Sequence, residues 1–156
     1  LVSSDISGLI GQYAHGNEPS HHIVHLYNYV NQSWKAQQLI DTILHTQYFN
    51  NPNGLSGNED CGQMSAWYVL NAMGFYQVCP GSPIYSVGRP IFDKVTINLP
   101  NGKVFEIIAN NNSRTNKYIQ SIRLDNILLE SPFFMHSDIM KGGKIIMEMG
   151  NTPVKQ

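Results

Sequence analysis

Two adjacent carboxylates, Glu59 and Asp60, lie in a glycine-flanked segment, Gly57–Gln63, that ends where an apolar run begins. Asp60 followed by Gln63 fits a capping box, and an acid at a helix start is stabilised by about 0.3–1 kcal/mol through the helix dipole. A cap requires only one acid, however. Carboxylates on a loop that is held by a rigid helix are typical of general bases that activate water. The pattern leaves a structural cap and a catalytic base as alternatives.

A second polar cluster, His15–His22, also ends at a predicted helix start. Oxygen atoms of Asn17 and Glu18 would suit a hard cation such as calcium, whereas His21 and His25, at positions i and i+4, would suit zinc. The zinc alternative is the weaker one, because a histidine stands where a zinc-protease helix carries glutamate. A first-turn acid and hydrogen-bonded core histidines are the structural alternatives.

Aromatic residues flank both clusters. Sugar rings stack on such side chains, but aromatics at helical spacing more often belong to the core. We assign Trp67 and Tyr68 to the core and leave the others open. The aromatic residues near the clusters are Tyr13, Trp34, Trp67, Tyr68, Phe75 and Tyr76.

Composition narrows the classes of partner. The chain has 156 residues, of which 42% are hydrophobic and only 13% charged, with a net charge of −1. Nucleic acid is excluded as a partner, because its recognition requires clustered Lys and Arg. Apolar runs such as Ala66–Leu70 are far shorter than the roughly 20 residues of a membrane span. Cys61 and Cys79 have no metal-type spacing, and no disulfide is assumed between them.

Three helices are expected in the first half of the chain. Apolar residues recur at helical spacing from Pro19 to Val30, and again from an N-cap at Ser33 to Tyr48,. The third helix, Gly62–Met73, is apolar almost all round, which predicts burial on most sides. Gly74 follows it at the position of a left-handed C-terminal cap.

Strands are expected in the second half, where the apolar period changes to two. Val95, Ile97 and Leu99 share one face, and the turn Pro100–Gly102 leads into a second run, Lys103–Ala109, which predicts a hairpin,. Two further strands are predicted over 118–124 and 144–149. The chain is therefore predicted to be α+β, with the helices first, antiparallel strands second, and the boundary between residues 76 and 90.

This arrangement leaves surfaces uncovered. Three helices with wide apolar faces and about four strands need another layer to cover their second apolar surfaces. We expect exposed apolar patches that a partner, or further chain, would cover.

Several segments resemble signatures of one enzyme family, glycoside hydrolase family 92. The first is Gly8–His22, read as GLIGQYAHGNEPSHH, and the second is Gly57–Val69, read as GNEDCGQMSAWYV. Phe92–Val95 and Leu99–Lys103 resemble the strands near the family's C-terminus. The motifs are long and cover nearly the whole chain, which makes a chance match improbable.

The resemblance implies a calcium-dependent exo-α-mannosidase that removes terminal mannose from glycans with inversion, of the α-1,2-mannosidase type. Residues 1–80 would form the last helices of an (α/α)6 barrel, and residues 81–156 a β-strand region that joins a β-sandwich in the complete enzyme. The partners implied are a mannose-containing glycan and the remainder of the same enzyme, and a secreted, periplasmic or cell-surface location follows from the family alone.

The resemblance also assigns site residues. Asp60 would be the general base, with Glu59 beside it, either to orient the water or to raise the pKa of Asp60 by like-charge repulsion. Calcium would be held by Asn17, Glu18 and Asp60. The substrate-binding residues would be His15, Glu18, His21, Trp34 and Gln63.

One half of the catalytic pair is missing from this sequence. In the family, the general acid lies in a motif of Glu-Gly followed shortly by Trp-Gln-Tyr, and this sequence has no such motif. Inverting hydrolysis requires both an acid and a base. We therefore expect the 156 residues to be inactive alone. The alternatives are a carbohydrate-binding or scaffold module, which would retain affinity for mannose, and a folded remnant that binds neither calcium nor sugar.

Overall fold

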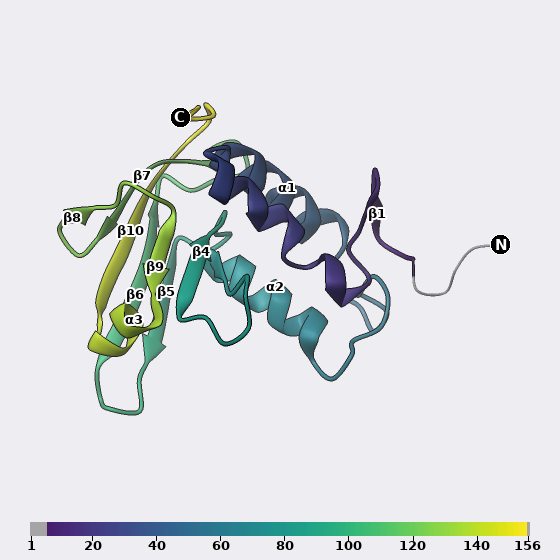
Figure 1. Ribbon diagram of the computed structural model, residues 1–156, viewed down its shortest axis with the longest axis horizontal. Coiled ribbons are helices and arrows are strands. Elements are labelled where there is room, and N and C mark those ends of the chain that lie inside the picture. Colours follow the sequence, from purple (N-terminus) through teal and green to yellow (C-terminus); the bar gives the residue numbers. More distant parts are fainter. Residues whose placement is uncertain (1–5, 156) are drawn as a thin grey trace.

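The computed structural model describes residues 6–155, and helices fill the first half of the chain (Figure 1). Two of the predicted helices are confirmed, as α1 (Ser33–Thr46) and α2 (Gln63–Met73). Gly74 has the predicted left-handed conformation, with φ of 105°. Ser33 is not the N-cap of α1, because Gln32 occupies that position and no side chain caps the helix. No helix in the described residues is long and apolar enough to cross a membrane.

The first predicted helix differs from the expectation in its winding and in its buried face. It forms two 3-10 segments, η1 (Glu18–Ser20) and η2 (Ile23–Val30). Residues i and i+3 lie in line in a 3-10 helix, which places His25 and Asn28 on one face. That face is the buried one, and most of the predicted apolar stripe points outward. The exposed apolar residues of η2 are Ile23, Leu26, Tyr29 and Val30.

Hydrogen bonds explain why the polar face of η2 is buried. His25 Nε2 donates to Asn71 Oδ1 of α2 over 2.9 Å, and His25 Nδ1 lies 3.2 Å from Ser86 Oγ. Asn28 Nδ2 donates to Ser86 Oγ and to Val87 O. Buried polar groups need such partners, so this network orients η2.

Five strands form the main sheet, in the order β5-β6-β10-β7-β8. The predicted hairpin is confirmed, since β5 pairs with β6 across the Asn-Gly turn. The two further predicted strands are also present as β7 and β10. The strands are β5 (Lys94–Asn98), β6 (Val104–Asn110), β7 (Tyr118–Leu124), β8 (Ile127–Leu128) and β10 (Gly143–Gly150).

The prediction of antiparallel strands throughout is wrong at one pairing. β10 runs parallel to β6, although it is antiparallel to β7 on its other side. The chain leaves the sheet after β8 and returns between β6 and β7. A parallel pair requires such a long crossover instead of a tight hairpin, and the apolar period alone does not reveal it.

Three short strands and a short helix connect the layers. β3 (Phe75–Tyr76), β4 (Ile84–Val87) and β9 (Phe133–Met135) form a second sheet, and β9 leads into α3 (His136–Lys141). Figure 1 shows β4 between the main sheet and the helices. A further hairpin, β1 (Leu9–Ile10) with β2 (Tyr13–Ala14), lies at the far end of the helices.

Buried apolar side chains form two clusters, one under the main sheet and one among the helices. Trp67, which is fully buried, belongs to the helical cluster, as the sequence predicts. Leu70 packs against both clusters and so joins the two layers. The overall class is α+β, whereas the barrel and the domain boundary at residue 80 remain predictions.

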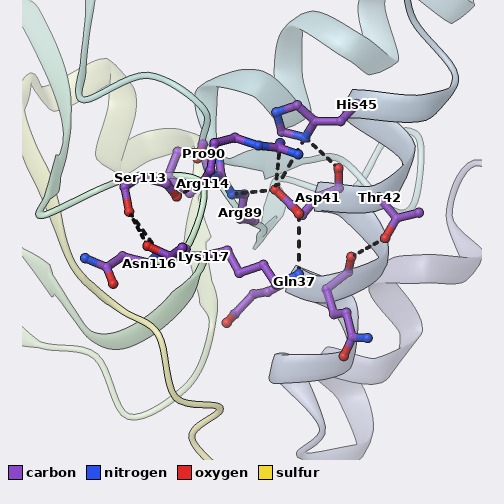
Figure 2. Close-up of polar contacts among 12 residues, drawn as sticks. Gln37, Asp41, Thr42, His45, Arg89, Pro90, Ser113, Arg114, Asn116 and Lys117 are labelled. Atoms are coloured by element: carbon purple, nitrogen blue, oxygen red, sulfur yellow. Dashed lines mark hydrogen bonds and ion pairs between the residues drawn. The ribbon is translucent and has the colours of Figure 1, made fainter.

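A buried charge network ties α1 to segments beside the main sheet (Figure 2). Asp41 Oδ1 lies 3.1 Å from Arg89 Nε, and its carboxylate is also within 4 Å of Arg114 and Lys117. Arg89 is 2% exposed and donates to Ser113 O. Because burial lowers the pKa of Arg89, the Asp41 carboxylate is needed to hold its charge there,.

Candidate functional site

The two polar clusters lie on loops that meet through glycine backbones. A Cβ atom on Gly57 would lie 2.3 Å from Gly16 O, and one on Gly16 would lie 2.0 Å from Ser7 Oγ. Gly57 also has φ of +81°, which glycine adopts without strain,. Both loops lie at the end of the helices remote from the main sheet (Figure 1). This contact explains the glycine beside the carboxylates and brings the loop of Glu18 to the loop of Asp60.

The carboxyl groups of Glu18 and Asp60 face each other across this junction. A hydrogen bond with Glu18 raises the pKa of Asp60, and desolvation and the charge of Glu18 act in the same direction. Glu18 is therefore the carboxyl group that raises the pKa of Asp60, a role that the sequence leaves open as one of two alternatives for Glu59. Glu18 Oε1 is buried and has no hydrogen-bond partner in the described part of the chain.

The backbone is left-handed at the three residues that lead from Glu59 into α2. Asp60, Cys61 and Gly62 have φ of 47°, 56° and 93°. Left-handed geometry costs a non-glycine residue about 1–2 kcal/mol, and such strain concentrates at functional sites. Cys61 is an exposed free thiol, as is Cys79 at the far end of the predicted helix.

Asp60 does not cap α2, so the capping-box interpretation is wrong for this residue. The N-cap position belongs to Gly62, and no side chain of that residue is available to bond the helix. Glu59 supplies the acceptor instead: its Oε1 accepts from Ser65 N–H over 3.0 Å, and its Oε2 from Ser65 Oγ over 2.9 Å. The Asp60 side chain is thereby free of the helix and exposed.

His15 is fully buried beneath the junction, between two tyrosines. Tyr48 Oη donates to Met64 O, so its oxygen accepts from His15 Nε2, 2.7 Å away. His15 Nδ1 then accepts from Tyr13 Oη over 2.9 Å. Burial lowers the pKa of His15 to about 3, with the charge of His21 acting in the same direction. His15 is therefore neutral at physiological pH and anchors the loop that carries Glu18.

His21 is the second buried histidine of the same loop. Its Nε2 donates to His15 O over 3.1 Å, and its Nδ1 accepts from Gln63 Nε2 over 3.2 Å. Trp67 Nε1 in turn donates to His21 O over 3.0 Å. Desolvation lowers the pKa of His21. These bonds fix the Glu18 loop to the first turn of α2.

The structure thus brings together most of the residues that the sequence singled out. Asn17, at the start of η1, adjoins Glu18 in the chain. Trp34 lies elsewhere. It is at the start of α1, about 20 Å along the helix from the end that leads to Tyr48, and its ring contacts Lys155 near the C-terminus,. The residues that join the cluster are His15, Asn17, Glu18, His21, Glu59, Asp60 and Gln63.

Sequence reasoning missed Tyr48, whose hydroxyl links His15 to the start of α2. It follows α1 in a position typical of an ordinary core aromatic, so no local signal marks it. Burial raises the pKa of Tyr48 and of Tyr13, so both hydroxyls stay protonated. Tyr13 was named only among possible sugar-stacking aromatics, and its hydrogen bond to His15 is a different role.

The donor set fits part of a calcium shell and does not fit zinc. His25 is engaged by Asn71 and Ser86, away from His21, and burial lowers its pKa to about 4. The unpartnered buried oxygen of Glu18, opposite Asp60, is the kind of hard ligand that calcium prefers,. No group of three or more His, Cys, Asp or Glu side chains in residues 6–155 is placed to hold a metal. Calcium takes six to eight oxygens, so other ligands would have to complete the shell.

Solved structures with the same fold include mannosidases. A family GH92 α-mannosidase from Bacteroides thetaiotaomicron, in complex with mannoimidazole, is 44% identical with a TM-score of 0.91, and the match covers 96% of this chain and 20% of that one. A family GH92 inverting mannosidase from the same species is 42% identical with a TM-score of 0.85, over 92% of this chain and 19% of that one.

A curated relative is more distant. An uncharacterized secreted glycosidase of Arthroderma benhamiae is 27% identical over 138 residues, which are 86% of this chain and 18% of that protein. The chain therefore spans about a fifth of the length of the relatives it matches. The glycosyl hydrolase family 92 catalytic domain model matches residues 2–151, nearly the entire sequence. By that match, the chain belongs to glycosyl hydrolase family 92.

Proposed function

We propose that this chain is the part of an inverting exo-α-mannosidase, of the α-1,2-mannosidase type, that supplies the general base and the calcium side of the active site. The observation that supports this most is the exposed Asp60 carboxyl, which is freed from α2 by a left-handed turn and faces Glu18. One relative forms a complex with mannoimidazole and another is an inverting mannosidase, and both facts support the proposal.

Asp60 acts as the base in this proposal. In inverting hydrolysis one carboxylate removes a proton from the attacking water while a second carboxylic acid, about 6.5–9.5 Å away, protonates the leaving oxygen. The acid would come from the remainder of the enzyme, so the isolated chain would not turn over substrate.

Asn17, Glu18 and Asp60 would provide the oxygen ligands that this chain gives to calcium. When bound, the cation would orient and distort the sugar ring. Glu18 contributes the orphaned buried oxygen, and its loop is fixed by His15 and His21 beneath it. These histidines, together with Gln63, would hold the mannose-binding loop in its conformation.

Trp34 remains a proposed sugar contact that this cluster does not include. It would face a part of the site formed by the rest of the enzyme. A location outside the cytoplasm is proposed with the enzyme, supported by the secreted glycosidase among the relatives.

The alternative is a non-catalytic carbohydrate-binding or scaffold fragment. It is supported by the length of the chain, which is about a fifth of that of the relatives. A binding fragment would retain affinity for mannose without any partner segment, whereas the enzyme segment would gain activity only with the remainder of the chain.

Replacement of Asp60 by Asn in the full-length enzyme tests the proposal. The amide cannot accept the proton of water, and loss of a general base lowers turnover by about 10²–10⁴-fold. Because Asp60 does not cap α2, the folded yield and the urea midpoint should stay unchanged. Turnover per folded molecule that stays near the wild-type value would refute Asp60 as the base.

A further inference from the structure

Glu59 and Asp60 are neighbours in sequence, but their side chains have different partners. Both carboxylate oxygens of Glu59 accept hydrogen bonds from Ser65, one from its N–H and one from its hydroxyl. The Asp60 carboxyl instead meets Glu18. Glu59 is thus committed to the start of α2, whereas Asp60 is not.

The bonds of Glu59 close the left-handed turn into a ring. Its backbone carbonyl accepts from Met64 N–H over 3.3 Å, and its side chain reaches Ser65. Both bonds span Asp60, Cys61 and Gly62, the three successive residues with positive φ. Two of these three are not glycine, so the left-handed conformation must be held by contacts from outside the turn.

The other end of the turn is held by packing. Gly57 lies against the backbone of Gly16, with no room for a side chain on either residue. The segment between Gly57 and Ser65 is therefore fixed at both ends, by a glycine contact at one and by Glu59 at the other. Asp60 lies between these two fixed points.

We propose that Glu59 is a positioning residue, which holds Asp60 in its left-handed conformation by bonding Ser65, and that it is not a second catalytic carboxylate. The proposal rests on the proposed role of Asp60 as the base. The family resemblance placed Glu59 beside Asp60 as a second catalytic residue, and the positioning role replaces that assignment.

This role requires an oxygen acceptor and not a negative charge. Glutamine at position 59 keeps an acceptor oxygen of the same reach, whereas alanine removes it. A residue that exchanges protons with water or substrate would lose its function in both variants. Glutamine and alanine at this position therefore separate positioning from catalysis.

The experiment measures kcat, KM and the pH profile of kcat/KM for the full-length enzyme, with Asp60→Asn as the reference. Glu59→Gln should keep kcat within about threefold and leave the pH profile unchanged, because the acceptor remains. Glu59→Ala should lower kcat about 10–100-fold, because small misplacement of a catalytic group has effects of this size.

A double-mutant cycle with Ser65→Ala identifies the partner. If Glu59 acts through Ser65, adding Ser65→Ala to Glu59→Ala lowers kcat no further, so the two effects do not multiply. Amide hydrogen exchange at Ser65 in the same variants reports the cap directly: exchange should be faster in Glu59→Ala than in Glu59→Gln.

The outcomes separate this inference from the proposed function. A Glu59→Gln enzyme as inactive as Asp60→Asn, or losses in the cycle that multiply, would overturn the positioning role while Asp60 stayed the base. An Asp60→Asn enzyme with normal turnover would overturn the proposed function itself, and the inference with it.

Discussion

Gly57 leaves no room for a side chain at the junction of the two loops. Alanine at this position would place its Cβ 2.3 Å from Gly16 O and would also require φ of +81°. We expect Gly57→Ala to lower the free energy of unfolding by about 2–4 kcal/mol, through strain and overpacking together. Urea unfolding of the 156-residue chain measures it.

Gly81→Ala is the matched control for Gly57→Ala. Gly81 has φ of +84°, yet a Cβ atom there would meet no atom within 4 Å. Only the conformational cost of about 1–2 kcal/mol should remain. Equal losses for the two variants would show that the glycine contact does not hold the loops together.

His25 makes stability depend on pH in a defined window. Its pKa is about 4 in the folded chain because of burial, against the ordinary value of 6.5. As pH falls below 6.5 the unfolded chain takes up the proton and the folded chain does not, so stability is complete above pH 6.5 and declines towards pH 4. This group should contribute a loss of about 2–3 kcal/mol over that window.

Urea midpoints at several pH values between 7 and 4.5 test the His25 prediction. His25→Gln should reduce the pH dependence but not abolish it, because burial also lowers the pKa of His15 and of His21,. His22→Gln, at an exposed neighbouring position, is the control. The same pH slope in both variants would contradict the assignment to His25.

At the level of single residues, the sequence predicts which acids cluster better than it predicts what each acid contacts. The cluster of Glu59 and Asp60 is visible from composition and spacing. The different contacts of the two side chains are not visible, because they depend on the positive φ of Asp60 and on the bond from Ser65 to Glu59. Neither leaves a sequence signal stronger than the pattern of an ordinary capping box.

The positions of helices and strands can be predicted from the local sequence, whereas the pairing of the strands cannot. Gly74 and the Asn-Gly turn mark element ends correctly because both depend on a left-handed residue,. The parallel pairing of β10 with β6 and the short strands β3, β4 and β9 depend on distant segments. The buried face of η2 was mispredicted for the same reason, since Asn71 and Ser86 select it.

Asp41 links α1 to Arg89, Arg114 and Lys117 beside the main sheet. Asp41→Asn would leave the buried Arg89 guanidinium without its carboxylate partner (Figure 2). Breaking one side of a buried ion pair costs about 3–5 kcal/mol, and we expect a loss of that size in the free energy of unfolding. Thermal or urea unfolding of the variant measures it.

The control for Asp41→Asn is Glu106→Gln, which removes a pair with Lys94 on the exposed surface of β5 and β6. Exposed pairs contribute about 0–1 kcal/mol. If Asp41→Asn proved as mild as Glu106→Gln, the network would be a surface feature and not a junction of layers.

Across the whole molecule, η2 presents an apolar stripe to solvent. Leu26 is 44% exposed and Val30 is 59% exposed. Clustered exposed apolar residues mark surfaces that another segment covers. Since relatives are about five times longer, we expect the remainder of the enzyme to cover this stripe.

Leu26→Glu together with Val30→Glu tests the coverage of η2. An exposed apolar stripe favours self-association of the isolated chain, and the two substitutions should reduce it in sedimentation velocity. In the full-length enzyme they should lower stability, because charges would be buried. Ile127→Glu, at the exposed β8 turn, should have a smaller effect in both settings. A variant pair that leaves full-length stability unchanged would contradict coverage of the stripe.

We propose that one side of a mannosidase site is already assembled in this chain, which spans about a fifth of the length of its relatives. Calorimetric titration of calcium into the 156-residue chain, with and without a mannose-like inhibitor, tests it most directly. We predict one weak site, with a Kd on the order of 10⁻³ M because the shell is incomplete. The inhibitor should tighten it, and Glu18→Gln should weaken it. Absence of calcium binding to the wild-type chain, or identical binding to Glu18→Gln, would contradict the claim.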